Sequence, residues 1–280
     1  MAGRLFHRFL EEDDDLGVVP NRDFHPVGPG ITDWGQRGSA ELTEWEALLD
    51  AIEDAPGRLT AVELGAGFGR WTVNAAAAIR RYRPDLKYRL LAVEAEPTHF
   101  RWLKQHTRAN GLRRWSRAGT CKLIHAAVSG RAGRDRFYFG NPSAWYGQTL
   151  VRPVNEGFDG PVTEVRTVTL SSLLQPLDRV DLIDIDIQGA ELEVLREVAP
   201  ALGHVQRIHV ETHFETIDEQ LPTVLAGAAG NWRQDAAIPL GARRTTPLGE
   251  ADFSEGGVQV WRNVTRLTRR QGNPQGRSPE

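Results

Sequence analysis

Acidic and histidine side chains gather at the ends of two short apolar runs. Asp184 and Asp186 lie in "VDLIDIDIQG", and Glu211 and His213 lie in "IHVETHFE". Because residues two apart on a β-strand point to the same face, each run would present a pair of polar side chains. Two carboxylates and an imidazole could take a proton from a hydroxyl group, or could bind a divalent cation such as Mg²⁺ that lowers the pKa of that hydroxyl. We therefore predict Asp186, Glu211 and His213 as catalytic residues, with Asp186 and Glu211 as candidate metal ligands.

The same residues also have a purely structural interpretation. Asp186 could shape only the turn before Gly189, and Glu211 could pair with an arginine. His209 or His213 could be a polar group with satisfied hydrogen bonds. Neighbouring carboxylates also arise in structural networks. Both interpretations stay open at the level of the sequence.

A second pattern, "VELGAGFGRW", joins a strand-like run to a helix-like run through Gly65, Gly67 and Gly69. Glycines at such a turn let the backbone approach a ligand without a side chain in the way. Nucleotide-like ligands bind at the carboxyl end of a parallel strand. The spacing differs from the nicotinamide fingerprint, whose third glycine would stand where this chain has Arg70.

A second carboxylate, Glu94, lies at the end of the next predicted strand. Glu94 ends the apolar run of "LLAVEAEP", where a carboxylate can accept hydrogen bonds from both hydroxyls of a ribose. Alternatively, Glu94 could be a solvent-facing strand end, and Glu63 could be a helix-terminus or surface carboxylate. Together, in a strand–loop–helix–strand context, the two carboxylates favour a nucleoside cofactor.

The elements that must position these residues alternate between strands and helices. Such alternation implies right-handed crossovers and a parallel sheet covered on both faces. Strands are expected up to Leu64 and in "YRLLAVEAE", "CKLIHAAVS", "VDLIDID", "QRIHVETHFE" and "GGVQVWRN". Helices are expected in "SAELTEWEALLDAIEDA" with Thr43 and Glu46 as a capping box, from about Trp71, from Pro97 to Gly111, after Gly189, and around Pro222.

The chain resembles the FkbM-type, S-adenosylmethionine-dependent methyltransferases in "VELGAGFGRW", "AVEAEP" and "VRTVTLSSLL...VDLIDIDIQGAELEVLRE". Class I methyltransferases broadly share the first two motifs, whereas the third, above all "IDIDIQGAELEVL", is family-level evidence. The resemblance runs from about Leu59 to Glu215. It departs from the family pattern at Asp184, where lysine or another residue is frequent, and at Gln188, where glutamate is common. These departures leave the acceptor chemistry open.

The resemblance implies an α/β, Rossmann-like class I methyltransferase fold. Its sheet would be mostly parallel and seven-stranded, with an antiparallel last strand and helices on both faces. It also implies transfer of a methyl group from S-adenosylmethionine, usually to a hydroxyl oxygen. By this resemblance Gly65 and Gly67 approach the methionine part of the cofactor, with Glu63 near its ammonium group. Glu94 would hold the ribose and Ala126 would line the adenine. The implied cofactor-binding set also includes Ala66, Arg70, Trp71, Ala95 and Asp186.

We expect an irregular N-terminal arm over residues 1–38, a methyltransferase domain over 39–263 and a disordered tail over 264–280. Trp34 in the arm, with Trp145 and Tyr146 in a long glycine-rich loop, could form a lid or an acceptor wall. Aromatic faces suit sugars and planar rings, and long loops inside a compact domain are often functional. Packing beneath the loop is the alternative.

Composition excludes several classes of protein. The chain has 280 residues and a formal net charge of −3, which argues against a dedicated nucleic-acid binder. A single cysteine, Cys121, excludes an intramolecular disulfide and a cysteine-based zinc cluster. No apolar run reaches the length of a signal peptide or a membrane span. We therefore expect a cytoplasmic protein that acts on a small-molecule or glycan acceptor.

Other functions remain as alternatives. A nicotinamide-dependent oxidoreductase would need a glycine at Arg70 and a tyrosine–lysine or histidine catalytic pair, and neither is found. A non-catalytic nucleotide-binding module would tolerate the loss of Glu94 or Asp186, and both are present. An N- or protein-methyltransferase is the remaining alternative. The Asn/Asp-Pro-Pro-Tyr/Phe-like signature of many amino-group methyltransferases is absent from "DIDIQGAE".

Overall fold

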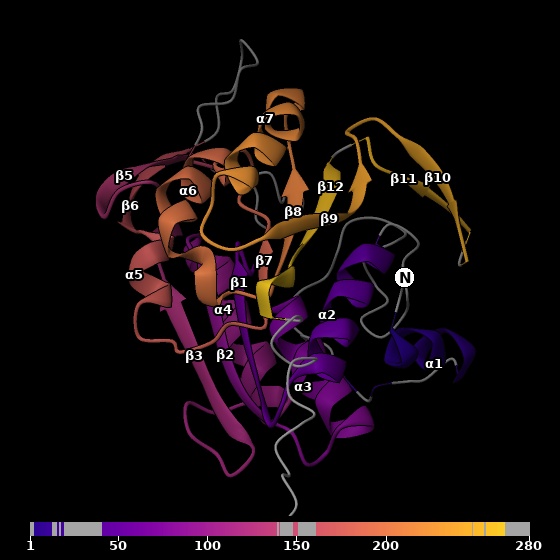
Figure 1. Ribbon diagram of the computed structural model, residues 1–280. Coiled ribbons are helices and arrows are strands. Elements are labelled where there is room, and N and C mark those ends of the chain that lie inside the picture. The colour runs from indigo at the N-terminus through magenta and orange to yellow at the C-terminus, as the bar shows by residue number, and fades with distance from the viewer. Residues whose placement is uncertain are drawn as a thin grey trace, which may run out of the picture.

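A seven-stranded sheet in the order β3–β2–β1–β7–β8–β12–β9 forms the centre of the computed structural model (Figure 1). The strands are parallel except for β12, the last in the chain, which runs antiparallel to both of its neighbours. The predicted mostly parallel sheet with an antiparallel last strand is confirmed. The strands are β1 (Arg58–Leu64), β2 (Lys87–Glu94), β3 (Gly119–His125), β7 (Leu182–Ile185), β8 (Arg207–Thr212), β9 (Trp232–Ile238) and β12 (Gly257–Asn263).

The structure describes residues 3–12, 16, 18–19, 41–138, 140, 148–150, 161–247, 249–254 and 256–266. The aromatic residues of the expected lid, Trp34, Trp145 and Tyr146, lie outside the described residues. Most of the expected arm over 1–38 and of the expected tail over 264–280 lies outside them as well.

The strand order reverses beside β1. From β1 the chain builds outward through β2 to β3, and it later places β7 on the other side of β1, with β8 beyond it. The pairing of these parallel strands sets Glu63 beside Asp184 and Asp184 beside His209. Ligands of open α/β sheets bind outside the carboxyl ends of the strands at such a reversal. The fold therefore predicts a ligand site at the carboxyl ends of β1, β7 and β8.

Helices cover both faces of the sheet, and each face has its own apolar core. The first core contains buried residues of α2 and α3 with Leu59 of β1, and the second contains buried residues of α5, α6 and α7 with Val62 of β1. Leu59 and Val62 differ by an odd number of positions, so the period-2 alternation of a strand sends them to opposite faces. The helices are α2 (Leu42–Asp54), α3 (Arg70–Tyr82), α4 (Pro97–Ala109), α5 (Leu170–Leu174), α6 (Glu191–Val198) and α7 (Glu215–Ala226).

A helix also lies within the region expected to be an irregular arm. α1 (Arg4–Glu12) buries Phe6 and Phe9 in the first core. The ring centroids of Phe9 and Trp45 of α2 are 4.6 Å apart with the rings tilted by 31°, and the backbone N–H of Gly3 donates to Asp50 at 2.8 Å. Two apolar rings three positions apart lie on one helical face, and this packing stabilises the helix.

The predicted capping box of α2 is wrong. The helix begins at Leu42, one residue before Thr43, and Glu41 at the N-cap makes no capping hydrogen bond through its side chain. Because Thr43 already lies in the first turn, its hydroxyl donates to Glu44 Oε2 at 3.0 Å instead of receiving a backbone N–H.

α7 runs through Pro222 without a break. Proline has no backbone N–H, so the carbonyl of Asp218, four residues earlier, loses its helical partner. The buried side chain of Gln259 on β12 donates to that carbonyl at 2.9 Å. A side chain from the neighbouring strand thus satisfies the bond that the proline removes.

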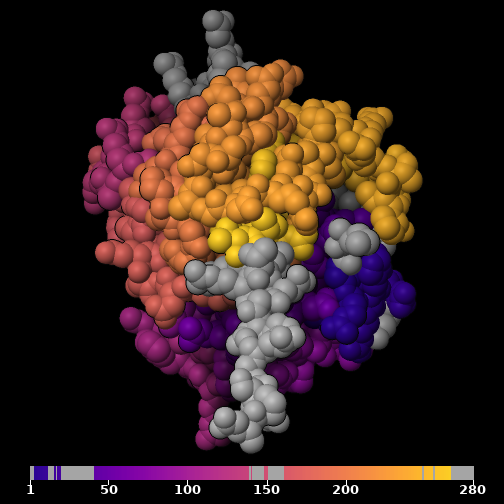
Figure 2. Space-filling model, in the orientation of Figure 1, coloured from indigo at the N-terminus to yellow at the C-terminus, as the bar shows by residue number. Residues whose placement is uncertain are grey.

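Two smaller sheets extend the core. β4 (Ala127–Val128), β6 (Val162–Val168) and β5 (Gly133–Tyr138) form a three-stranded sheet beside the carboxyl end of β3, and β10 (Arg243–Thr246) pairs with β11 (Gly249–Asp252). Figure 2 shows the C-terminal elements, from orange to yellow, over the upper part of one face, with α1 in indigo beside them. Within the described ranges, no helix is long and apolar enough to span a membrane.

Candidate active site

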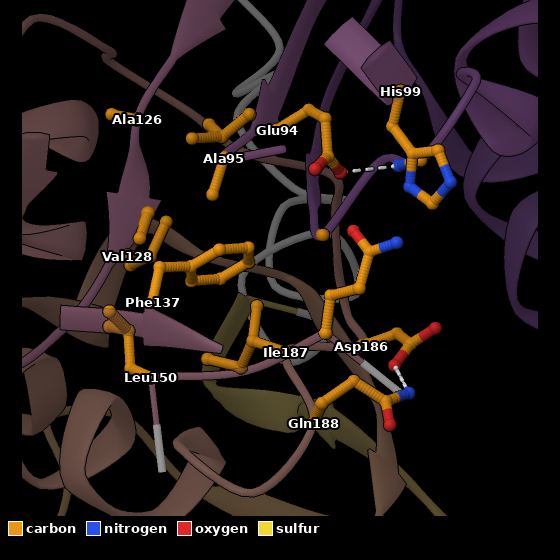
Figure 3. Close-up of a pocket in the computed structure, with 15 residues that line it drawn as sticks. Glu94, Ala95, His99, Ala126, Val128, Phe137, Leu150, Asp186, Ile187 and Gln188 are labelled. Atoms are coloured by element: carbon orange, nitrogen blue, oxygen red, sulfur yellow. Dashed lines mark hydrogen bonds between the residues drawn. The ribbon is translucent and has the colours of Figure 1, made fainter. Parts of the chain in front are cut away.

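A cavity opens at the strand-order reversal, where the carboxyl ends of β1 and β2 face the residues that follow β7. Its empty volume, including the part open to solvent, is about 540 Å³, within the range of small-molecule sites. Figure 3 shows Glu94 on one side of this space and Asp186 and Gln188 on the other. The apolar side chains of Val128, Phe137, Leu150 and Ile187 gather along a third side. The cavity therefore has polar ends and an apolar wall.

The glycine loop forms the floor of this cavity. Gly65, Gly67 and Gly69 have φ values of 76°, 54° and 82°, in the left-handed region that favours glycine. The N–H groups of Gly65 and Ala66 both donate to the carbonyl of Val93, at 3.0 and 2.9 Å. The loop is thereby fixed against the end of β2, and its backbone at Gly65 and Gly67 faces the cavity without side chains.

Glu94 is buried and lines the cavity. Its Oε2 accepts the N–H of Gly67 at 2.7 Å, and its Oε1 accepts the N–H of Glu96 at 2.6 Å. Burial raises the pKa of Glu94 to about 8, and the two backbone hydrogen bonds oppose that rise. Each carboxylate oxygen has a second lone pair, so Glu94 can be held by the backbone and still accept hydrogen bonds from a ligand.

Glu63 lies behind the glycine loop rather than at the cavity. Its Oε1 accepts the N–H of Trp71 at 3.0 Å, and its Oε2 accepts the N–H and the hydroxyl of Thr72, the N–H at 2.9 Å. The carboxylate thus caps the N-terminus of α3 where the helix dipole favours a negative charge. Burial raises its pKa to about 8, although the bonds from Thr72 oppose this rise.

The cavity brings together part of the predicted cofactor-binding set. Gly65, Gly67, Glu94, Ala95, Ala126 and Asp186 line it, whereas Glu63, Ala66, Arg70 and Trp71 do not. Arg70 forms an ion pair with Glu41, and its guanidinium lies 5.4 Å from the ring of Trp71. The roles of these residues toward the cofactor stay predictions.

Nine of the fifteen described lining residues were not in the predicted set, and four of these nine form the apolar wall. Val128 and Phe137 come from the small β4–β6–β5 sheet, Leu150 from the segment after β5 and Ile187 from the turn after β7. The one available signal was the alternation in "RDRFYFG", which predicts that Phe137 faces a core. This alternation does not indicate which part of the protein Phe137 packs against.

Asp186, Glu211 and His213 meet beside the cavity, as the adjacency of β7 and β8 predicts. One potential ligand atom from each lies within 4.8 Å of the others. His213 Nε2 is 3.5 Å from Asp186 Oδ1 and 4.0 Å from Glu211 Oε1. Asp186 also lines the cofactor cavity and accepts a hydrogen bond from Gln188 at 2.9 Å. This cluster can bind a proton or a cation next to the space where a cofactor fits.

Glu191 fixes the far side of the His213 ring. Its side chain is fully buried, and its Oε1 lies 2.9 Å from His213 Nδ1. The same oxygen accepts the N–H of Gly189 at 3.0 Å and that of Ile187 at 3.3 Å. Among the described residues, Oε2 of this carboxylate has no hydrogen-bond partner. Glu191 therefore orients the turn after β7 and the imidazole together.

The electrostatics of the cluster reflect crowded carboxylates. Burial, followed by the charge of Asp186, raises the pKa of Glu211 to about 9. Loss of hydration also raises the pKa of Asp186, while His213 opposes it. Burial alone would lower the pKa of His213, but the hydrogen bond to Glu191 and the charges of Asp186 and Glu191 raise it to about 9. A positive charge at this point is therefore stabilised.

Asp184 belongs to a different network from Asp186. Its Oδ1 lies 2.8 Å from Nδ1 of His209, beside it on β8. Both side chains are buried, and His209 Nε2 is 4.0 Å from Glu44 of α2. Asp184 and His209 thus form a pair on the face covered by α2, below the reaction cluster. For His209 the structural interpretation, a polar group satisfied in the core, describes what the structure shows.

Comparison with known proteins identifies the chain. The model of the methyltransferase FkbM domain matches residues 63–234, more than half of the sequence. The chain belongs to the FkbM methyltransferase family. The FkbM resemblance is thereby confirmed, and the protein is an S-adenosylmethionine-dependent methyltransferase.

Individual relatives of this FkbM methyltransferase are distant. A protein from Jannaschia sp. (strain CCS1), described as "Putative methyltransferase", is 26% identical over 234 residues, which are 81% of this chain and 80% of the relative. The solved methyltransferase FkbM of Methylobacillus flagellatus KT is 12% identical with a TM-score of 0.47, covering 80% of this chain and 55% of that one. The precorrin-6y C5,15-methyltransferase of Geobacter metallireducens GS-15 is 13% identical with a TM-score of 0.45, covering 88% and 97%.

The cavity fits the cofactor that the family implies. A loop with two glycines facing the cavity, a buried carboxylate held by two backbone N–H groups and an apolar wall suit the ribose and the base of a nucleoside. These features come from the chain's own geometry.

Proposed function

We propose that this FkbM methyltransferase methylates a hydroxyl oxygen on a small molecule, a sugar or another natural product, with Asp186, Glu211 and His213 as its reaction centre. The observation that supports the proposal is the convergence of these three side chains within 4.8 Å at the rim of the cofactor cavity. An alcohol is a weak nucleophile, so O-methylation needs a group that removes the hydroxyl proton or lowers the pKa of the hydroxyl. The cluster supplies such groups.

In this proposal the cofactor would be held by the residues that line the cavity. Glu94 would accept the ribose hydroxyls, and Ala95 and Ala126 would lie along the adenine. Gly65 and Gly67 would leave room for the methionine part. S-adenosylmethionine supplies a methyl group that its sulfonium already activates, so the protein's task is to align the acceptor, exclude water and manage one proton.

The reaction centre could work as a base. Glu211 or His213, in its deprotonated form, would accept the proton of the acceptor hydroxyl as its oxygen bonds to the methyl carbon and the methyl–sulfur bond breaks. Because both groups have a pKa of about 9, turnover should rise as pH approaches that value. Glu191, through its contact with His213 Nδ1, would keep the imidazole turned toward Asp186. A base near the acceptor typically contributes 10²–10⁴-fold in rate.

Alternatively, the reaction centre could hold a divalent cation. Asp186 and Glu211 offer carboxylate oxygens and His213 offers Nε2, while waters and the acceptor hydroxyl would complete the shell. A cation there would relieve the repulsion between the carboxylates and would lower the pKa of a bound hydroxyl. Magnesium and manganese suit such an oxygen-rich set.

One experiment distinguishes these versions. Purified protein is screened with S-adenosylmethionine against sugars and hydroxylated natural products, and a mass gain of one methyl group identifies an acceptor. Turnover is then measured after exhaustive chelation and after Mg²⁺ or Mn²⁺ is returned. Under the cation version chelation abolishes turnover and the metal restores it, whereas under the base version chelation changes nothing.

Alanine variants of Asp186, Glu211 and His213 test the reaction centre itself. Each of them should lose turnover, and the Glu211 and His213 variants should still bind cofactor. Glu164→Ala is the matched control, because Glu164 is exposed and, among the described residues, forms an ion pair with Arg134 alone. If all three variants kept wild-type turnover, the reaction centre would lie elsewhere. If the methyl group appeared on nitrogen, an N-methyltransferase would replace the proposal.

A further inference from the structure

One edge of the molecule carries a concentration of positive charge that the methyl-transfer site does not use. From Pro97 to Arg134 the chain contains no aspartate or glutamate, although its formal net charge is −3. Seven exposed basic side chains lie along α4, the loop after it and β3, and we refer to them as the basic edge. They are Arg101, Lys104, Arg108, Arg113, Arg114, Arg117 and Lys122.

The charges of the basic edge are not neutralised within the described residues. None of the seven forms an ion pair with any of them, whereas Arg131 and Arg134, just beyond the edge, pair with Asp135 and Glu164. Unpaired charges of one sign along one edge of the sheet attract an anionic partner by charge complementarity.

An exposed aromatic side chain, Trp115, lies among the arginines of the basic edge. Trp115 is 73% exposed, while the next most exposed large hydrophobic side chain of the described residues, Val19, is 42% exposed. Arg113 and Arg114 precede Trp115, and Arg117 follows it at two positions. A tryptophan exposed among arginines is the composition that binds the interface of a lipid bilayer, because the indole enters the headgroup layer while the guanidinium groups meet phosphates.

The loop that carries Trp115 is held in place by the sheet. The N–H of Cys121 on β3 donates to the carbonyl of Arg113 at 3.1 Å, and the ammonium of Lys87 on β2 donates to the carbonyl of Arg117 at 2.9 Å. Its arginines and its tryptophan therefore project from a fixed backbone. Lys87 adds one more exposed positive charge beside them.

The loop of the basic edge that carries Trp115 lies away from the reaction centre, whereas Arg101 follows His99 of the cavity lining by two positions. Residues 110–118 precede β3 and so lie at the amino ends of the parallel strands (Figure 1). The cofactor cavity lies at their carboxyl ends. A strand of this length spans about 23 Å at roughly 3.3 Å per residue. A surface bound to the loop would thus leave the cavity open on the far side.

We propose that the basic edge docks the protein on an anionic lipid surface, with Trp115 at the headgroup layer and the arginines on lipid phosphates. Nucleic acid is the less suitable occupant, since proteins that bind single strands stack successive bases on several aromatics along a groove. Among the described large apolar side chains of this edge, Trp115 alone is exposed. Docking of this kind adds to the methyl-transfer function and does not depend on the identity of the acceptor.

Vesicle partition tests the proposal with the full chain. Sedimentation is measured with vesicles of phosphatidylcholine alone and with vesicles that contain 30% phosphatidylglycerol. The protein should bind only the anionic vesicles, and added salt should weaken the binding. R113E/R114E should lower the partition coefficient by about 25-fold or more, because each basic residue near an anionic membrane contributes roughly fivefold. Trp115→Ala should lower it as well.

The matched control is R166E/R244E, which reverses two exposed arginines, on β6 and β10, that form no ion pair with any of the described residues. This variant should bind vesicles as the wild type does, and all variants should melt at the wild-type temperature. Equal binding to neutral and anionic vesicles, or unchanged binding of R113E/R114E, would overturn the proposal. Absence of vesicle binding together with RNA binding that R113E/R114E abolishes would also overturn it, in favour of a nucleic acid.

Discussion

A Cβ atom on Gly65 would lie 1.6 Å from the backbone carbonyl oxygen of Asp186, so the two residues can meet only because Gly65 has no side chain. The contact joins the glycine loop after β1 to the turn after β7, and the N–H of Asp186 donates to the carbonyl of Leu64 at 3.0 Å. The residue that lines both the cofactor cavity and the reaction cluster is therefore positioned by the cofactor loop itself.

Gly65→Ala should consequently destabilise the protein by about 3 kcal/mol or more, from the clash and the left-handed φ together. Gly111→Ala is a control of matched conformation, because both glycines have a φ of 76° and a Cβ on Gly111 would meet nothing within 4 Å. It should cost only about 1 kcal/mol. Urea unfolding of the two variants gives the comparison, and equal losses would show that the contact with Asp186 contributes nothing.

Glu94→Ala should weaken cofactor binding by about 2–4 kcal/mol, since hydrogen bonds to a charged group are worth roughly 1.5–3 kcal/mol each. Calorimetry with adenosylhomocysteine measures the loss, and Glu164→Ala should bind as the wild type does. Because Glu94 also accepts the N–H groups of Gly67 and Glu96, the variant's melting temperature must be recorded alongside. Unchanged affinity in a folded Glu94→Ala protein would rule out the ribose contact.

Glu191→Gln should lower the pKa of His213 from about 9 toward the ordinary value near 6.5. Burial of the imidazole favours its neutral form, and the glutamine would remove the negative charge that outweighs burial. The wild-type imidazolium is lost only as pH rises through about 9, so the variant should lose it at a lower pH. An NMR titration of the His213 ring follows this directly. A pKa that stayed near 9 would assign the shift to Asp186 and Glu211 instead.

Gln259→Leu should destabilise the fold by about 2–4 kcal/mol, because the carbonyl of Asp218 and the indole N–H of Trp261 would both lose their partner. Adding Pro222→Ala should recover about 1 kcal/mol, since alanine restores a backbone N–H for that carbonyl. A double-mutant cycle in urea detects this coupling. Strict additivity of the two changes would mean that Gln259 does not compensate for the proline.

His106 should make stability depend on pH. Burial lowers its pKa to about 4, against an ordinary value of 6.5, while hydrogen bonds to the carbonyls of Phe68 and Val19 oppose the fall. Between these two pKa values His106 is protonated in the unfolded chain but neutral in the folded chain. The contribution of His106 to stability is therefore full above about pH 6.5 and is lost as pH falls toward 4. Between pH 7 and pH 5 the loss should be about 2 kcal/mol. His106→Gln should abolish this part of the slope in chemical unfolding.

The alternating elements, the glycine loop and the placement of Asp186 beside Glu211 and His213 could be predicted because their signals are local. Periodicity specifies the strands, and parallel neighbours bring their carboxyl ends together. The capping role of Glu63 is also local, yet the sequence left it as one of two interpretations. A carboxylate before a glycine loop can turn toward the helix or toward the ligand, and only the packed loop decides.

What the sequence could not indicate depends on contacts between distant segments. Phe137 lines the cavity because β5 pairs with β6, setting it opposite Thr163, and no local pattern specifies that pairing. The continuation of α7 through Pro222 depends on Gln259, and the helix at Arg4–Glu12 depends on the ring of Trp45. In each case the residue that decides the local structure lies far along the chain.

The position of β7 between β1 and β8 has a consequence for the synthesis of the chain. β1 is complete at Leu64, but the strand that covers its open edge begins only at Leu182. At roughly 5–20 residues per second a ribosome needs on the order of 6–24 s to make the intervening stretch. Throughout that interval the nascent chain carries an apolar strand with unpaired backbone groups on one side, the kind of edge that recruits other chains. Translation speed and chaperone access between β3 and β7 should therefore govern the yield of folded enzyme.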